Sequence, residues 1–336
     1  MAGELVLSAS SISTWQTCKR RYFYEKIKGM QPVEADALAF GSAMHRGFEQ
    51  IFRRMMESKQ AGETYSKEFH LATVEDACLS ALAVDLSASD RIKVEVLLGK
   101  YCRQYLEEDM ERLTVFGVEM HAYENIISPS MRTMRGMGVQ GYCDALAMYD
   151  GKVCIIEHKT TSVLNDDYFD RATIDMQVYL YADLFSRAIA HSHDDMPVSM
   201  VIYDAVQKPR HEMAVGETDE EFDARKAAAK CPERCKRKEA ETESDFRARL
   251  EASIDESYFR REYIRIDDAL AKEMREELWA VAHEIKGCKC YSKSTCNCMK
   301  WGRCPFMDVC LNHGSFDGLE EKFTERRARH EEESTD

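Results

Sequence analysis

The chain has 336 residues, 44% of them hydrophobic, and a formal net charge of −14, so it can form one large domain or two modest ones. The acidic balance argues against a protein whose whole surface binds polyanions, although a local basic strip could still bind nucleic acid. The sequence contains no run of about 18 apolar residues, which is the length that a membrane-spanning helix needs. The first residues lack a basic stretch followed by an apolar one, so we expect no signal peptide and a cytoplasmic protein.

The elements expected along the chain begin with a capped amphipathic helix over residues 8–31, with Ser11 or Ser13 as its N-cap. A second helix is expected over 40–60, after a break at Gly41. Further along, apolar residues recur first at helical and then at strand spacing. This pattern predicts strands at 116–127, 139–149 and 153–159, a helix at 171–190, a strand at 198–203, charged helices within 210–257, a strand at 258–266 and a helix at 267–287.

These elements divide the chain into six segments. They are N-terminal helices (1–65), a helical insertion (66–115), an α/β core (116–209), a charged helical insertion (210–257), a C-terminal helix with a cysteine-rich segment (258–315), and an acidic tail expected to be disordered (316–336).

The strongest local signal is a two-residue hairpin turn at 150–151, Asp-Gly, because both residues tolerate the positive φ of a type I′ turn. The register then follows from the turn, with the pairs Tyr149–Lys152, Met148–Val153 and Leu146–Ile155. Continued further, it places Asp144 directly opposite Glu157. Lys159 emerges on the same face as Glu157 because strand side chains alternate.

Two carboxylates facing each other across buried strands repel each other. A divalent cation would remove this repulsion, and two carboxylates with water suit Mg²⁺ or Mn²⁺. Such a cation would activate a water for attack on a phosphodiester. Lys159 would orient or deprotonate that water, or neutralise charge in the transition state. The alternative is a buried Glu157–Lys159 ion pair with an unrelated Asp144 on a surface hairpin.

Asp144, followed after twelve residues by Glu157-His158-Lys159, resembles the D…E-x-K signature of the PD-(D/E)XK nucleases. Two further motifs resemble the RecB-like branch of this family: G-x-x-x-H from Gly41 to His45, and Q-x-x-x-Y from Gln177 to Tyr181. Cys143 stands where the family signature has proline, a position that varies in the family.

The resemblance implies a restriction-endonuclease-like α/β fold, in which helices flank a mixed central sheet, with helical insertions and an iron–sulfur-stapled C-terminal segment. It implies catalytic roles for Asp144, Glu157, Lys159, Gln177 and Tyr181. The implied ligands of Mg²⁺ or Mn²⁺ are His45, Asp144, Glu157 and the backbone carbonyl of His158. The alternatives are that His45 is an ordinary core or surface histidine and that Tyr181 is simply part of the core.

The thirteen cysteines, an odd number, disfavour a disulfide framework and favour metal ligation where they cluster. Six of them fall within the 23 residues from Cys288 to Cys310. The resemblance implies that a [4Fe–4S] cluster is bound by Cys18, Cys298, Cys304 and Cys310, with Cys296 as an alternative to Cys298. An all-thiolate zinc site formed by four of the clustered cysteines is the other possibility.

A basic and aromatic stretch follows Cys18, and its mixture of cations and rings suits single-stranded DNA. Its candidate contacts are Lys19, Arg20, Arg21, Tyr22 and Tyr24. The alternative is an amphipathic helix with solvated charges.

The function implied by the resemblance is a single-strand-preferring DNA exonuclease of recombination, end processing or phage DNA metabolism. Its possible partners are a helicase, an annealing protein or an integrase. The alternatives are a catalytically silent DNA-binding or scaffold protein, and a nuclease that cleaves RNA or nicks duplex DNA.

Overall fold

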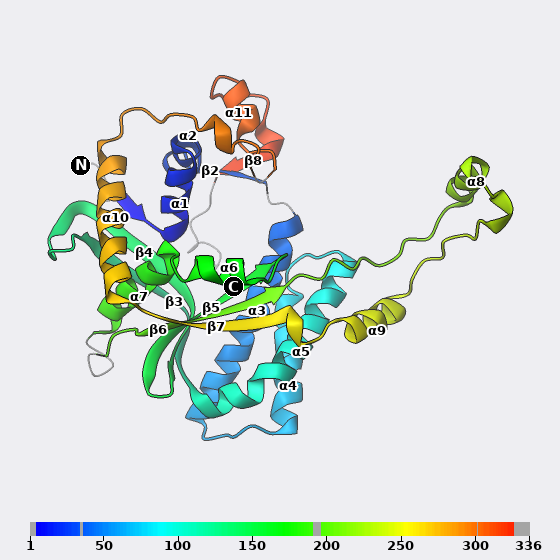
Figure 1. The fold of residues 1–336 in the computed structure, drawn as a ribbon, viewed down its shortest axis with the longest axis horizontal. Helices are drawn as coiled ribbons and strands as arrows, with labels where there is room; N and C mark the ends of the chain where they lie inside the picture. Colours follow the sequence, from blue (N-terminus) through cyan, green and yellow to red (C-terminus); the bar gives the residue numbers. More distant parts are fainter. Residues whose placement is uncertain (1–4, 34–35, 191–195, 301, 326–336) are drawn as a thin grey trace.

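The computed structural model describes residues 5–33, 36–190, 196–300 and 302–325. A six-stranded mixed sheet lies at its centre (Figure 1), with the order β1-β4-β5-β6-β7 and with β3 also paired to β4. The β1–β4 and β5–β6 pairs are parallel, and the other pairs are antiparallel. The strands are β1 (Leu5–Leu7), β3 (Leu113–Ile127), β4 (Thr133–Tyr149), β5 (Lys152–Thr161), β6 (Met200–Gln207) and β7 (Phe259–Arg265).

Helices cover both faces of the sheet, so its central strands are apolar on both sides. In β5, Cys154 and Ile156 enter one core, whereas Val153 and Ile155 enter the other, as the period of two in a strand requires. The first core is shared with α3 (Asp36–Gln60), α4 (Lys67–Ala81), α5 (Ala88–Arg112) and α9 (Glu243–Ser253). The second is shared with α1 (Ala9–Thr17), α6 (Asp166–Ala172), α7 (Met176–Ile189) and α10 (Asp268–Gly287).

The single N-terminal helix that we predicted is wrong, because the segment is broken at Cys18. Ser8 is the N-cap of α1 and forms a capping box with Ser11, so neither Ser11 nor Ser13 is the cap. At Cys18 the backbone is extended, with φ of −162° and ψ of 112°. The chain then continues as α2 (Lys19–Tyr22) and one π-helical turn (Phe23–Ile27).

Two other helix boundaries also differ from prediction. Gly41 lies inside α3 instead of before it, and a Cβ there would lie 3.4 Å from the Thr160 hydroxyl oxygen of β5. That distance is an ordinary van der Waals contact, so α3 passes the end of β5 without a steric need for glycine here. The helix predicted at 171–190 begins later, as α7 at Met176, because Asp175 is its N-cap; residues 171–172 instead end α6.

The charged insertion extends away from the sheet, whereas part of the acidic tail is packed against the N-terminal region. In Figure 1, α8 (Asp219–Ala228) lies at the end of an arm that projects away from the sheet. In the tail, β8 (Phe323–Glu325) pairs with β2 (Met30–Pro32), and Phe323 is buried. Residues 316–325 are therefore ordered, contrary to expectation, and residues 326–336 lie outside the described part. Within the described ranges, no helix is both long and apolar enough to span a bilayer.

Gly47 lies at a close contact between α3 and α5, and its substitution should lower the stability of the fold measurably. A Cβ at Gly47 would lie 2.6 Å from the buried Leu98 side chain. We expect Gly47→Ala to destabilise the fold by about 1–3 kcal/mol despite the better helix propensity of alanine. Urea unfolding measures this change.

Gly99→Ala is the matched control, since Gly99 is also inside a helix and a Cβ there would meet nothing closer than 3.9 Å. We expect it to raise the free energy of unfolding by about 0.5–1 kcal/mol. Equal effects of the two substitutions would refute a packing role for Gly47.

Candidate active site

The β4–β5 hairpin turns at residues 150–151, whose φ angles of 47° and 75° fit a type I′ turn. The predicted register is confirmed, with the pairs Tyr149–Lys152, Met148–Val153, Leu146–Ile155 and then Ala145–Ile156. The ladder stops there. The direct pairing of Asp144 with Glu157 that we predicted therefore does not form.

The backbone is irregular at Asp144. Cys143 and Ala145, which would share a face of a regular strand, lie in the cores on opposite faces. On β3, Glu119 lies between the partners of these two residues and has a φ of 50°, which costs a non-glycine residue about 1–2 kcal/mol. The Asp144 carboxylate accepts a hydrogen bond of 2.6 Å from the backbone N–H of His158. The carboxylate is thereby fixed against the end of β5.

His45, on α3, contacts the other oxygen of the same carboxylate. Its Nδ1 lies 3.3 Å from Oδ1 of Asp144. Burial favours a raised pKa for Asp144, but hydrogen bonds with His158 and His45 outweigh burial and hold this pKa well below its usual range. Burial favours a lowered pKa for His45, and the hydrogen bond and charge of Asp144 raise it overall.

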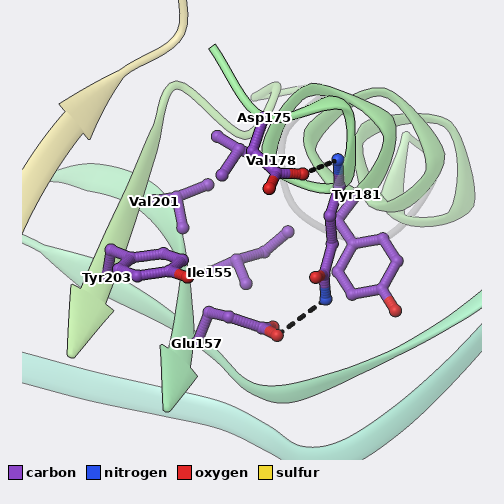
Figure 2. Close-up of a pocket in the computed structure, with 8 residues that line it drawn as sticks. Ile155, Glu157, Asp175, Val178, Tyr181, Val201 and Tyr203 are labelled. Carbon is purple, nitrogen blue, oxygen red and sulfur yellow. Dashed lines mark hydrogen bonds between the residues drawn. The ribbon is translucent and has the colours of Figure 1, made fainter. Parts of the chain in front are cut away.

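Glu157 forms the second half of the site and is only 6% exposed. Its Oε1 accepts hydrogen bonds from Lys159 Nζ at 2.5 Å and from Gln177 Nε2 at 2.7 Å. Figure 2 shows the second of these bonds as the dashed line that ends at Glu157. Burial raises its pKa, Lys159 opposes this effect, and the charge of Asp144 adds to it. The two carboxylates thus influence each other electrostatically, although they are not paired across the strands.

Gln177 and Tyr181 reach this site from α7. Asp175 caps the helix by accepting from the Gln177 backbone N–H, and the Gln177 side-chain oxygen accepts from Lys159 at 3.3 Å. Burial and then the charge of Glu157 raise the pKa of Tyr181 to about 12. A Cβ at Gly141 would lie 2.7 Å from the Tyr181 ring, so glycine leaves room for this ring.

One oxygen of the site is left without a partner, which bears on metal binding. Oε2 of Glu157 is buried and has no hydrogen-bond partner in the described structure, a costly state unless a ligand satisfies it. The donor set of one imidazole, two carboxylates and a backbone carbonyl suits Mg²⁺ or Mn²⁺. Among the residues that the structure describes, no three His, Cys, Asp or Glu side chains are already arranged to hold a metal ion. The donors fit such an ion by their chemistry and by the unsatisfied oxygen.

A cleft of about 580 Å³ adjoins Lys159, Gln177 and Tyr181. Its other wall is one side of α1, including Ser10, Ser13 and Gln16. Its size lies within the usual range of ligand pockets, about 300–1,000 Å³. A ligand could therefore approach Lys159 along α1.

The profile of the PD-(D/E)XK nuclease superfamily matches residues 6–311. The chain belongs to this superfamily. No curated protein sequence matches it. Among the solved structures that match, the crystal structure of SSO0001 is 12% identical and aligns over 84% of this chain and 78% of that chain, with a TM-score of 0.28. At that score, residues cannot be carried from one chain to the other.

The predicted restriction-endonuclease-like α/β fold is thereby confirmed, and the protein is a nuclease of a superfamily whose members typically use Mg²⁺ or Mn²⁺. Its sequence motifs meet at the site, since the G-x-x-x-H histidine, the D…E-x-K residues and the Q-x-x-x-Y glutamine all interact. Sequence reasoning missed the buried side chains behind the site. They are Tyr101, Asp109 and Asp204, the side chain of Arg261, which is 7% exposed, and the side chain of His158 itself.

The nuclease brings four of its cysteines to one cavity of about 160 Å³: Cys18, Cys298, Cys304 and Cys310. In the part of the chain that the structure describes, none of the thirteen cysteines forms a disulfide. Cys296 is exposed and does not line this cavity; its thiol lies 3.4 Å from the Ser294 hydroxyl. The cavity therefore favours Cys298 over Cys296.

The basic stretch of the nuclease differs from expectation. Tyr22 and Tyr24 are each 1% exposed, so neither ring can stack on a DNA base as we predicted. Arg20 donates to the carbonyl of Tyr291, which makes it part of the contact with the C-terminal segment. Lys19 pairs with Glu284 and Arg21 with Glu25, and both are partly exposed. Of the five predicted DNA contacts, Lys19 and Arg21 remain as candidates for binding phosphate.

Proposed function

We propose that this nuclease hydrolyses DNA and that it is a single-strand-preferring exonuclease of recombination, end processing or phage DNA metabolism. The observation that carries the assignment of the site is the buried Oε2 of Glu157, unsatisfied beside Asp144, His45 and Lys159. The cleft along α1 supports access of a DNA strand or a DNA end to this site. A helicase, an annealing protein or an integrase could supply such ends.

In this proposal His45, Asp144, Glu157 and the His158 carbonyl hold Mg²⁺ or Mn²⁺. When bound, the cation would activate water and stabilise negative charge on the scissile phosphate. Lys159 provides a cation next to Glu157, where it can bind a phosphate oxygen by a charge-assisted hydrogen bond. Gln177 holds Glu157 and Lys159 in position, and Tyr181 closes the site from α7.

The test compares end-labelled single-stranded DNA, duplex DNA and RNA, each with Mn²⁺ and with EDTA. We expect Mn²⁺-dependent release of short products from single-stranded DNA and slower cleavage of the other substrates. Preferred cleavage of RNA, or nicking of the duplex, would replace the proposed substrate. No cleavage of any substrate would favour a DNA-binding protein without activity.

We propose further that Cys18, Cys298, Cys304 and Cys310 bind a [4Fe–4S] cluster. Support comes from the cavity that these four free thiols line, at a junction where Asn297 donates to the carbonyl of Thr17 at 2.7 Å. The cluster would hold the N-terminal helices to the C-terminal segment, so its binding would contribute to folding.

A further inference from the structure

Three buried residues on neighbouring strands form a row behind the active site. His158 of β5 is the register partner of Asp204 of β6, and Asp204 is the partner of Arg261 of β7. Neighbouring strands are about 4.8 Å apart, so the three residues lie side by side, and the side chains of His158 and Arg261 both meet Tyr101 of α5. His158 and Asp204 are 1% and 0% exposed.

Hydrogen bonds fix the far end of this row. Arg261 donates to Asp204 at 2.6 Å and to both carboxylate oxygens of Asp109, on α5, at 2.6 and 2.7 Å. The Tyr101 hydroxyl accepts from Arg261 at 2.7 Å and donates to Asp204 at 2.7 Å. We call Tyr101, Asp109, Asp204 and Arg261 the arginine network.

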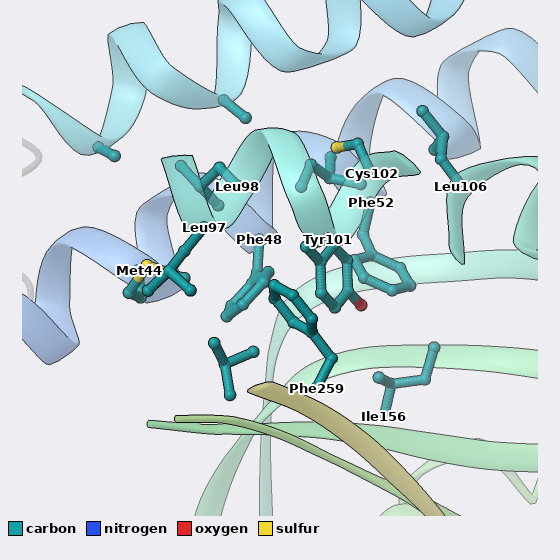
Figure 3. Packing of buried hydrophobic residues seen from close by; sticks show 14 of the residues in the cluster. Met44, Phe48, Phe52, Leu97, Leu98, Tyr101, Cys102, Leu106, Ile156 and Phe259 are labelled. Atoms are coloured by element: carbon teal, nitrogen blue, oxygen red, sulfur yellow. The ribbon is translucent and has the colours of Figure 1, made fainter. Parts of the chain in front are cut away.

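The imidazole of His158 lies between this network and the active site. Its ring stacks on Phe48 of α3, with centroids 4.3 Å apart and planes 11° apart. Figure 3 shows Phe48 and Tyr101 packed close to each other in this core. Nε2 lies 3.4 Å from the Tyr101 hydroxyl, and Nδ1 lies 3.5 Å from Oδ2 of Asp144. The same oxygen accepts from the His158 backbone N–H.

Stability alone is a weak reason for such a network. Burying two carboxylates and a guanidinium costs several kcal/mol per ion before their attraction offsets it, and apolar replacements of similar volume are often equally stable. The arginine network instead fixes the position of the His158 imidazole. Asp144 accepts a hydrogen bond from the His158 backbone, and the His158 ring lies 3.5 Å from the same oxygen, so movement of His158 would move the carboxylate.

We propose that His158 is a positioning residue for Asp144, and that the arginine network holds its imidazole in place through Tyr101. The inference rests on the proposed metal site, to which it adds a supporting layer. Partners behind metal ligands commonly contribute about 10- to 100-fold in metal affinity. His158 would thus contribute to the metal site twice: its backbone carbonyl would bind the metal, and its side chain would position Asp144.

The experiment is calorimetric titration of the metal-free protein with Mn²⁺, together with thermal unfolding in EDTA. Tyr101→Phe removes one hydroxyl, and His158→Phe keeps a ring against Phe48. We expect both to weaken Mn²⁺ binding by about 10-fold or more. Tyr105→Phe is the matched control, since Tyr105 lies one turn further along α5 and packs its ring on the same Arg261. We expect its affinity to equal that of the wild type.

Asp144→Asn is titrated in the same way, and the Mn²⁺ binding that it loses is the binding that belongs to this site. A Tyr101→Phe protein with wild-type Mn²⁺ affinity would overturn the inference, whatever His158→Phe does. A Tyr101→Phe protein that binds Mn²⁺ weakly but melts at the wild-type temperature in EDTA would support positioning over a purely structural role. A wild type that shows no Asp144-dependent binding would instead overturn the proposed metal site, and the inference with it.

Discussion

Lys159→Ala is expected to reduce cleavage by at least about 100-fold while DNA binding is retained. The ammonium group of Lys159 contacts both Glu157 and Gln177, and it is the cation placed beside the two carboxylates. Its loss removes the positive charge available to the phosphate during reaction. Initial rates on end-labelled single-stranded DNA with Mn²⁺, together with an electrophoretic binding assay in EDTA, measure the two effects separately.

Lys152→Ala is the matched control, because this lysine begins the same strand, is exposed and lies at the hairpin turn. It should cleave at the wild-type rate. Asp144→Ala should be as inactive as Lys159→Ala, since Asp144 connects His45 to His158. Wild-type cleavage by either active-site variant would show that the chemistry takes place elsewhere.

Cys310→Ser and Cys18→Ser are each expected to abolish the brown colour of anaerobically purified protein and to lower its thermal stability by several degrees. Either change removes one of four thiolates from the cavity that joins the two ends of the chain. Visible absorbance, iron and sulfide content, and melting temperature are the measurements.

Cys231→Ser provides the comparison, because Cys231 is exposed on the arm and far from the cavity in the sequence. It should remain as coloured and as stable as the wild type. A colourless wild type that contains zinc would replace the cluster with a thiolate zinc site. A brown, fully stable Cys310→Ser protein would remove Cys310 from the ligand set.

The sequence predicted the site best where a local signal sets the geometry. The turn at residues 150–151 determines the register of β4 and β5, and the apolar residues of both strands agree with it. The irregularity at Asp144 could not be predicted in this way, because no local pattern in β4 marks it and the residue opposite, Glu119 with its φ of 50°, belongs to a third strand.

Long-range packing explains the other differences between the predictions and the structure. Tyr22 and Tyr24 look like surface residues among their basic neighbours, yet both are buried, Tyr24 by contacts with Phe306 and Phe316 from the other end of the chain. The row of His158, Asp204 and Arg261 requires the register of three strands, two of which are separated by the arm. No periodic pattern within one segment contains that information.

The pairing of β2 with β8 has a consequence for biosynthesis. The partner of Met30 is Glu325, so β2 must wait for a strand that is synthesised about 300 residues later. At about 5–20 residues per second, this delay is on the order of 15–60 seconds. During that time Tyr24 has not yet been buried by Phe306 and Phe323 of the C-terminal segment. A chaperone that binds nascent chains could bind the exposed apolar surface.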